Sequence, residues 1–276
     1  LLLEEIITLP SQPTTLARIT ELMADPNCSL ATVGKVISAD PAIAIKALRL
    51  VNSAHYSLPN QIVSIEHAVM LLGLKVIRNL VLSATVFETF KKGADDLLIH
   101  CVACGVAMRV LVETCATDMP LLAQDAFVYG LLHDIGKIIF LEYLPHETAL
   151  VEAKCKTGRM PSYEAEHEIL GCDHAELGAR LALSWKLPDS LTWAIAGHHD
   201  IARCPDSHTQ RIAALLSVSD FICSSCGMVS VWDTGLYDLD ESVWTASRIT
   251  STITPKLIES FIKCMPEIRE LTEIAR

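Results

Sequence analysis

The segment YGLLHDIGKIIF, residues 129–140, places three ionisable side chains in an otherwise apolar stretch. Burying an ion costs several kcal/mol unless it is paired or bound to metal, so His133, Asp134 and Lys137 should each have a partner. The His-Asp dipeptide occurs again at 199–200, and the dipeptide alone is therefore a weak signal. A metal site needs further ligands from elsewhere in the chain.

A set of seven residues could supply those ligands, because each lies in, or at the end of, a predicted helix with an apolar face. They are His100, His133, Asp134, His174, His198, His199 and Asp220. Imidazole and carboxylate groups suit first-row divalent metals, and we expect one or two ions of Fe, Mn, Zn, Ni or Co. Neighbouring helical residues project about 100° apart, so Asp134 can contact two ions while His133 contacts one. Two ions can clamp a phosphoryl group and lower the pKa of a bound water to about 7.

The alternative is that these histidines are unrelated to one another. Several separate apolar contexts would then each have to supply a different partner for a buried polar group, which weakens this alternative. Four other histidines are expected to be solvated or to have ordinary packing partners. They are His55, His67, His146 and His208.

The ten cysteines raise the question of disulfides or zinc. No secretion signal is visible and most of the cysteines have apolar neighbours, as buried thiols of a reducing cytoplasm do. Two Cys-x-x-Cys pairs, 101/104 and 223/226, also match half-sites of a zinc ribbon. Cys101 and Cys104, however, lie in LLIHCVACGVAMRVLVETC, which is expected to form one buried helix with both thiols on one face. Core thiols are favoured, and zinc stays the minor alternative.

Composition narrows the class of protein. The 276 residues are 51% hydrophobic, which argues against disorder, and no uninterrupted apolar run reaches the roughly 18–20 residues of a membrane span. The net charge of -11 argues against nucleic-acid or anionic-membrane partners, which attract clustered Lys and Arg. A small phosphorylated ligand stays possible, because a metal supplies positive charge. We expect a cytoplasmic protein. Because the chain begins at Leu1 without Met, we also expect a missing upstream regulatory domain.

Apolar spacing and capping residues predict helices almost throughout. The fold class is all-α in two helical lobes, 1–92 and 93–276, divided at the polar segment KKGADD. In the first lobe we expect helices near 14–25, 29–40, 41–54, 64–73 and 74–90. In the second we expect 96–116, 124–143, 146–157, 163–170, 173–185, 189–199, 208–225 and C-terminal helices around Pro266, with 228–233 extended.

Long ordered segments of the chain resemble HDOD proteins, the HD-related output domain branch of the HD superfamily. The resemblance covers about residues 5–225 and rests on ADPAIAIKALRLVNSAHYSLP, SIEHAVMLLGLKVIRNLVL, LLIHCVACGVA, YGLLHDIGK, DHAELGARLALSWKLPDSLTWAIAGHH and LLSVSD. Metal ligands of HD phosphohydrolases follow the order H, HD, H, HH, D, which the seven candidates fill. The resemblance to the HD-GYP phosphodiesterases implies that Asp134 bridges two ions. It assigns His100, His133 and Asp220 to one ion, and His174, His198 and His199 to the other.

Two features of this resemblance bear on activity. Lys137 occupies the lysine position of HDxxxK, which implies a phosphate contact; the alternative is a lysine that extends its ammonium to solvent. After His199 the chain reads DIARCPDSHTQ without a GYP motif, which puts cyclic-dinucleotide hydrolysis in doubt.

Two functions therefore remain. The favoured one is a signal-transduction output module with a structural or ligand-sensing metal site and a protein partner. Its candidate contact surfaces are the turn NSAHYSLPNQ (52–61) and the groove between the lobes. The other is a metal-dependent phosphohydrolase of a nucleotide or other phosphoester, with Asp134 and Lys137 catalytic. An open metal position beside a phosphate-sized cleft would favour the enzyme, and a site capped by bulky side chains would favour the module.

Overall fold

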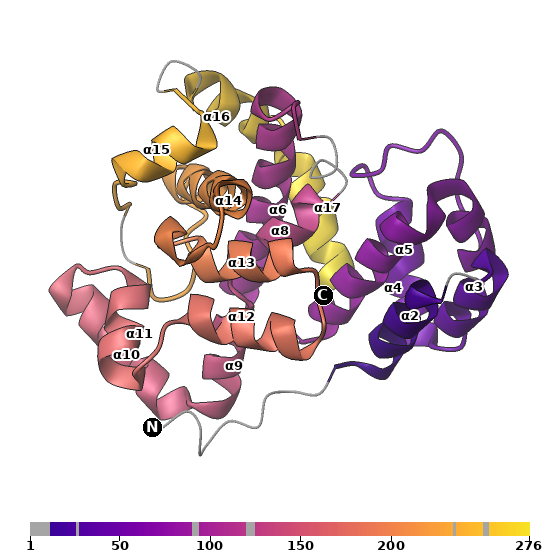
Figure 1. Cartoon of the computed structure of the whole chain (residues 1–276), viewed down its shortest axis with the longest axis horizontal. Helices are drawn as coiled ribbons and strands as arrows, with labels where there is room; N and C mark the ends of the chain where they lie inside the picture. Colours follow the sequence, from indigo (N-terminus) through magenta and orange to yellow (C-terminus); the bar gives the residue numbers. More distant parts are fainter. Residues whose placement is uncertain (1–11, 26–27, 90–93, 120–124, 234–235, 251–253) are drawn as a thin grey trace. The chain divides into compact units, whose positions relative to one another are not determined.

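The computed structural model describes residues 12–25, 28–89, 94–119, 125–233, 236–250 and 254–276. Within these ranges the chain is helical and contains no strand, which confirms the all-α prediction (Figure 1). Residues 228–233, expected to be extended, form turns and irregular backbone. The helices form two compact units, and each is described by itself.

The N-terminal unit comprises residues 11–92 together with 264–276. Its helices are α2 (Thr14–Ala24), α3 (Leu30–Ser38), α4 (Pro41–Val51), α5 (Ile65–Thr89) and α17 (Met265–Ala275). The division at 92/93 predicted from the sequence placed α17 in the other lobe, whereas α17 packs on α4 and α5. Lys46 Nζ donates to the Ala275 carbonyl at 2.9 Å, and His55 Nδ1 lies 2.8 Å from Glu267 Oε1. The contact of His55 covers part of the turn 52–61, which was expected to be a contact surface.

Local capping explains where these helices begin. Ser29 accepts a hydrogen bond from Thr32 N at 3.1 Å, and Asp40 accepts one from Ile43 N at 3.3 Å ahead of Pro41. Gly73, where the sequence predicts one helix to end and the next to follow, interrupts α5 with φ 78°. Only glycine adopts this conformation at little cost.

The central unit spans residues 93–263. Its helices are α6 (Asp95–Cys115), α8 (Ala126–Leu132), α9 (Ile135–Tyr143), α10 (Pro145–Gly158), α11 (Ser162–Leu170), α12 (His174–Ser184), α13 (Asp189–Gly197), α14 (Ser207–Ser225), α15 (Glu241–Ser247) and α16 (Thr254–Ile262), with a short 3-10 helix at Ile201–Arg203. The single helix expected over 124–143 is instead two, α8 and α9, which separate at His133 and Asp134. The projection of these two side chains is thus set by a helix break, and the 100° argument for a continuous helix does not apply.

Glycines allow the helices of the central unit to approach one another closely. An added Cβ on Gly130 of α8 would lie 2.4 Å from the Cys104 carbonyl of α6. One on Gly136 of α9 would lie 2.0 Å from the carbonyl oxygen of His174, the first residue of α12. These two approaches bring α6 close to α8 and α9 close to α12.

Two helices, α5 over residues 65–88 and α6, are long and apolar enough to cross a membrane by length and composition alone. Within the folded chain 56% and 78% of their most apolar windows are buried, as in the core helices of globular domains. For α6 this burial comes from packing on α8 and α14.

Candidate metal centre

All seven candidate ligands meet in the interior of the central unit. His100 lies on α6, His133 and Asp134 at the α8–α9 break, and His174 at the start of α12. His198 and His199 follow the end of α13, and Asp220 lies on α14. Five of the seven are at most 2% exposed: His100, His133, Asp134, His174 and His198. His199 is half-buried, and the Asp220 side chain is 25% exposed.

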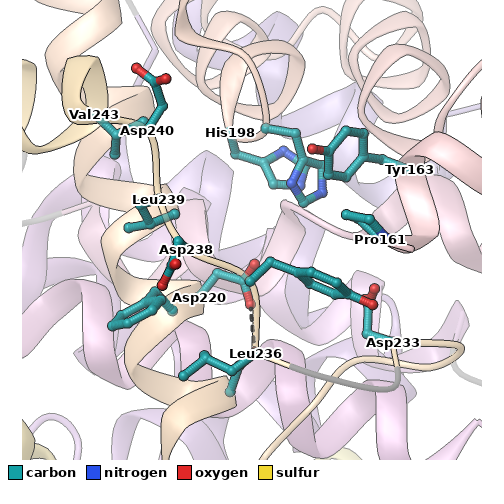
Figure 2. Close-up of a pocket in the computed structure, with 14 residues that line it drawn as sticks. Pro161, Tyr163, His198, Asp220, Asp233, Leu236, Asp238, Leu239, Asp240 and Val243 are labelled. Carbon is teal, nitrogen blue, oxygen red and sulfur yellow. Dashed lines mark hydrogen bonds between the residues drawn. The ribbon is translucent and has the colours of Figure 1, made fainter. Parts of the chain in front are cut away.

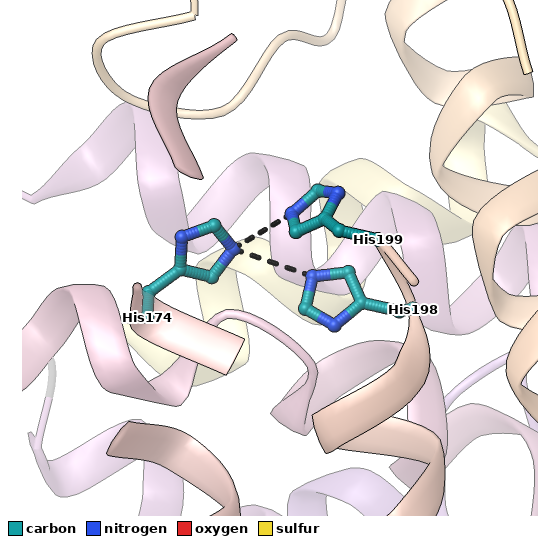
Figure 3. A group of neighbouring side chains, drawn as sticks. All are labelled: His174, His198 and His199. Atoms are coloured by element: carbon teal, nitrogen blue, oxygen red, sulfur yellow. Dashed lines mark hydrogen bonds between the residues drawn. The ribbon is translucent and has the colours of Figure 1, made fainter. Parts of the chain in front are cut away.

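The donor atoms fall into groups that match the two predicted ion sites. His174, His198 and His199 form one group, shown in Figure 3, and His100, His133 and Asp220 form another. His133, Asp134 and His198 form a third, which links the first two. Within each group the possible ligand atoms all lie within 4.8 Å of one another. The structure thus brings the predicted residues together; that they bind metal stays a prediction.

In three of the buried histidines the Nδ1 atom, on the side of the ring away from the cluster, faces a backbone carbonyl. Nδ1 of His100 donates to the Met228 carbonyl at 2.8 Å, Nδ1 of His133 to Gly130 at 2.6 Å, and Nδ1 of His198 to Ile195 at 2.7 Å. A carbonyl oxygen only accepts, so each Nδ1 carries the proton. In the neutral ring Nε2 then carries a lone pair, and an unprotonated ring nitrogen is the atom that binds metal.

The Nε2 atoms of the cluster lie close to one another. His100 Nε2 lies 3.2 Å from His133 Nε2, and His174 Nε2 lies 3.3 Å from His198 Nε2 and 2.9 Å from His199 Nε2 (dashed lines in Figure 3). Nitrogen atoms that converge at these distances from separate helices can act as ligands of a common ion. Because the donors are imidazole and carboxylate, the arrangement fits a divalent transition metal.

The surroundings of His198, His199 and Asp134 shift their pKa values toward the protonation states that bind metal. Burial lowers the pKa of His198 and of His199, and neighbouring histidines add to the effect, so both pKa values lie well below the ordinary range. Burial raises the pKa of Asp134, but His133, Lys137 and His174 outweigh burial and hold it well below the ordinary value. A neutral imidazole and an ionised carboxylate are the metal-binding forms.

Glu166 of α11 is a site residue that the sequence reasoning missed. It is fully buried, and its Oε2 accepts from His174 N at 2.7 Å and His174 Nδ1 at 2.6 Å. Burial lowers the pKa of His174, but Glu166 and Asp134 raise it to about 10. Carboxylates commonly orient metal-bound histidines in this way. No signal in the sequence marks this glutamate, because it lies on a separate helix eight residues before His174.

Lys137 is 1% exposed, so the expectation that its ammonium extends to solvent is wrong. Nζ donates to Ser230 Oγ at 2.8 Å and to Asp233 Oδ2 at 3.1 Å, and lies 3.2 Å from Asp134 Oδ2. Three acceptors thus surround its three protons. A phosphate contact by Lys137 stays a prediction, and this arrangement does not favour it.

A pocket of about 190 Å³ reaches the cluster at His198, His199 and Asp220 (Figure 2). The Tyr163 ring stacks on His199 at its wall, with ring centroids 4.4 Å apart. Its other lining residues include Phe221, Tyr237, Asp233, Asp238 and Asp240. Among the described residues that line it there is no Lys or Arg, so its side chains offer no permanent positive charge to an anionic ligand.

The remaining candidates stay outside the cluster. His67, His146 and His208 are exposed, and His55 pairs with Glu267 in the N-terminal unit, as expected of solvated or packing residues. All ten cysteines lie in the described part of the chain, and none belongs to a group that could hold a metal. The structure therefore favours core thiols over a zinc ribbon.

Several known proteins share this fold. A candidate phosphohydrolase from Shewanella amazonensis SB2B superposes with a TM-score of 0.77 at 23% identity, covering 100% of this chain and 98% of that chain. An HDOD domain protein of unknown function from Geobacter sulfurreducens has a TM-score of 0.77 at 21% identity, covering 99% and 95%. A candidate signal transduction protein from Marinobacter aquaeolei VT8 has a TM-score of 0.77 at 21% identity, covering 97% and 60%. These identities show the shared fold alone.

Sequence similarity identifies the family. An uncharacterized protein of Treponema pallidum (strain Nichols) is 26% identical over 215 residues, which are 77% of this chain and 42% of that protein. The chain thus spans less than half the length of this relative. The model of the HDOD domain family matches residues 9–201, well over half of the chain, and its match ends before Asp220. The chain belongs to the HDOD domain family.

Proposed function

We propose that this chain is an HDOD signal-transduction output module whose central unit holds one or two divalent transition-metal ions. The observation that carries the metal centre is the set of imidazole nitrogens that face one another while their outer nitrogens already have acceptors. In this proposal the ions are structural or take part in sensing a small ligand. The name of the Marinobacter aquaeolei protein supports a signalling function.

The pocket favours a module over a hydrolase of polyanions. Asp233, Asp238 and Asp240 lie along its lining, and no lysine or arginine joins them among the described lining residues. Lys137, the one cation beside the cluster that the family pattern offers, is enclosed by its own acceptors. A phosphoester entering the pocket would meet carboxylates, and only bound ions would attract it.

A protein partner in a signalling pathway is part of this proposal. The N-terminal unit exposes 76% of Val63 and 68% of Met70, and these are the apolar side chains that such a partner would cover. A small phosphorylated ligand of the central unit is the other candidate partner. The greater length of the Treponema pallidum relative supports a further domain in the whole protein. The ten thiols support a reducing compartment such as the cytoplasm.

A metal-dependent phosphohydrolase is the second candidate, because the pocket reaches His198, His199 and Asp220 directly. In that reading the seven residues would hold ions that polarise a phosphoryl oxygen. The names of two Shewanella amazonensis structures, one of them a candidate metal-dependent phosphohydrolase, support it. The chain's own contribution would be to position the ions and to admit the phosphoester through the pocket.

One pair of measurements on the purified, untagged protein tests both candidates. Elemental analysis gives moles of each transition metal per chain, and turnover is followed with nucleotides and a chromogenic phosphodiester. We expect bound metal and turnover no higher than that of Asp134→Ala. Turnover that is lost in Asp134→Ala would favour the hydrolase instead. Absence of metal after anaerobic reconstitution would remove the metal centre from both.

A further inference from the structure

Residues 228–233, called the strap here, follow α14 and contact the surroundings of the metal cluster. The strap follows Gly227, whose φ is 82°. The Met228 carbonyl accepts from His100 Nδ1 at 2.8 Å, so the strap contacts the metal cluster at its first residue. Two further strap residues, Ser230 and Asp233, contact Lys137. The three strap residues that make these contacts lie beyond residue 201, where the family match ends.

The two carboxylate oxygens of Asp134 have different surroundings. Oδ2 accepts a hydrogen bond from Ser230 Oγ and lies 3.2 Å from Lys137 Nζ. Oδ1 lies 3.0 Å from His174 Nε2 and 3.5 Å from His133 Nε2. The torsion that turns an aspartate carboxylate has a broad energy profile, so the side chain does not fix this choice by itself. The hydroxyl and the ammonium hold Oδ2, which also lies 3.7 Å from His100 Nε2, and Oδ1 therefore faces His174 and His133.

Lys137 can hold Oδ2 only if its own position is fixed. Its Nζ is buried and needs more than one acceptor, because a buried charge that lacks full hydrogen bonding is costly. Asp233 Oδ2 supplies a second carboxylate at 3.1 Å. Asp233 is in turn held by Ser162 at the start of α11, whose N and Oγ donate at 2.9 Å and 3.0 Å. The same helix carries Glu166, which orients His174.

We infer that Ser230 and Asp233 are positioning residues of the metal centre: together with Lys137 they fix the carboxylate of Asp134 so that Oδ1 faces His133 and His174. This inference rests on the proposed metal centre. Lys137 then serves as an internal cation between Asp134 and Asp233 and is not a phosphate ligand. The strap is thus part of the metal-binding structure, although it lies outside the matched family region.

The test compares metal affinity in strap variants. Ser230→Ala removes the hydroxyl donor to Asp134, and Asp233→Asn removes the second charge beside Lys137. Asp189→Asn is the matched control, because Asp189 at the start of α13 is exposed and is not among the residues that line the pocket. Affinity for Co²⁺ is measured by competition with a chromophoric chelator, and the visible absorption of the cobalt-loaded protein reports ligand geometry.

We expect Ser230→Ala and Asp233→Asn to bind about 10–100-fold more weakly than the unmodified chain, with altered cobalt spectra, as for other partners of metal ligands. Ser230→Thr, which keeps the hydroxyl, should restore both affinity and spectrum. The control should match the unmodified chain. A Lys137→Met/Asp233→Asn double variant should bind no more weakly than Lys137→Met alone, because Asp233 acts through the lysine.

Several results would overturn the inference. If the unmodified chain binds cobalt and both strap variants bind equally well with the same spectrum, the positioning role is wrong and the metal centre stands. If the unmodified chain binds no metal, the proposed centre and the inference fail together. Circular dichroism of the metal-free variants identifies unfolding. Should Asp233→Asn unfold, the Ser230→Ala and Ser230→Thr pair decides, since an equal loss in both would exclude the hydroxyl.

Discussion

At the scale of single residues, four of the five histidines of the cluster are oriented by a contact of their second nitrogen. Backbone carbonyls fix three of them, and Glu166 fixes His174. The seven candidate ligands could be predicted, because their order follows a known pattern. Glu166, Ser230 and Asp233 could not, because nothing in their local sequence marks a side chain that contacts a ligand from another element.

Asp134→Ala should lose metal and lower the melting temperature of the protein. Its carboxylate lies 3.0 Å from His174 Nε2 and 3.2 Å from Lys137 Nζ, so its loss leaves a buried ammonium with one fewer counter-charge. Removing one partner of a buried pair costs about 3–5 kcal/mol. Elemental analysis and thermal melting measure the two effects, with Asp189→Ala as the exposed control outside the pocket. Full metal content with an unchanged melting temperature would refute the ligand assignment.

Glu166→Gln should weaken metal binding about 10–100-fold and leave the fold intact. The amide keeps the shape and one acceptor for the backbone of His174, but the charge that favours the oriented, electron-rich imidazole is gone. Glu164→Gln on the same helix is the control, because Glu164 is exposed. Chelator competition gives the affinities. Equal affinities for the two variants would show that Glu166 only fills space.

The thiols give a pH-dependent prediction. Six cysteines are buried and four are partly exposed. Burial raises the pKa of Cys155 to about 11 and that of Cys172 to about 12, so their reactive thiolates form only at strongly alkaline pH. At pH 8 a thiol reagent should modify up to four cysteines in the native protein and all ten after unfolding. Mass spectrometry of the modified peptides identifies them. Rapid native modification of Cys101 or Cys104 would contradict the buried-thiol assignment.

At the scale of helices, most elements could be predicted from apolar spacing and capping residues. One exception that bears on the site is the break between α8 and α9, which lies within the largely apolar segment AFVYGLLHDIGKIIF. Local periodicity favours one helix there. The break is stabilised by contacts with distant segments, such as those of Asp134 with His174 and Ser230, which a local pattern cannot contain.

Gly136→Ala should destabilise the central unit and weaken metal binding. The added Cβ would lie 2.0 Å from the His174 carbonyl oxygen, a backbone atom that moves only if α9 and α12 separate. Overpacking of this kind costs about 1–3 kcal/mol. Gly158→Ala on α10 is the control, because its nearest contact would be Met160 Sδ at 3.6 Å. Thermal melting and cobalt titration report both effects. A Gly136→Ala protein as stable as the control would contradict the close packing.

At the scale of the whole molecule, the all-α class followed from the sequence, but the membership of the units did not. The C-terminal helix α17 joins the N-terminal unit through contacts such as Lys46 with Ala275 and His55 with Glu267. Each partner lies more than 200 residues away along the chain. Such pairing depends on complementary surfaces and leaves no local signal in either segment.

The proposed metal centre lies in the central unit alone, so metal removal should act on that unit. At a free metal concentration of 100 times Kd, binding stabilises the native state by about 2.7 kcal/mol. Chelation should therefore increase hydrogen exchange in peptides of α6, α9, α12 and α14. Peptides of α2, α3 and α4, which carry none of the seven residues, should exchange at unchanged rates. Asp134→Ala is the matched control, since a chain that binds no metal should not respond to the chelator. Uniform faster exchange across both units would mean that the metal stabilises the chain as one cooperative body, and no change anywhere would mean that the ions do not hold the helices together.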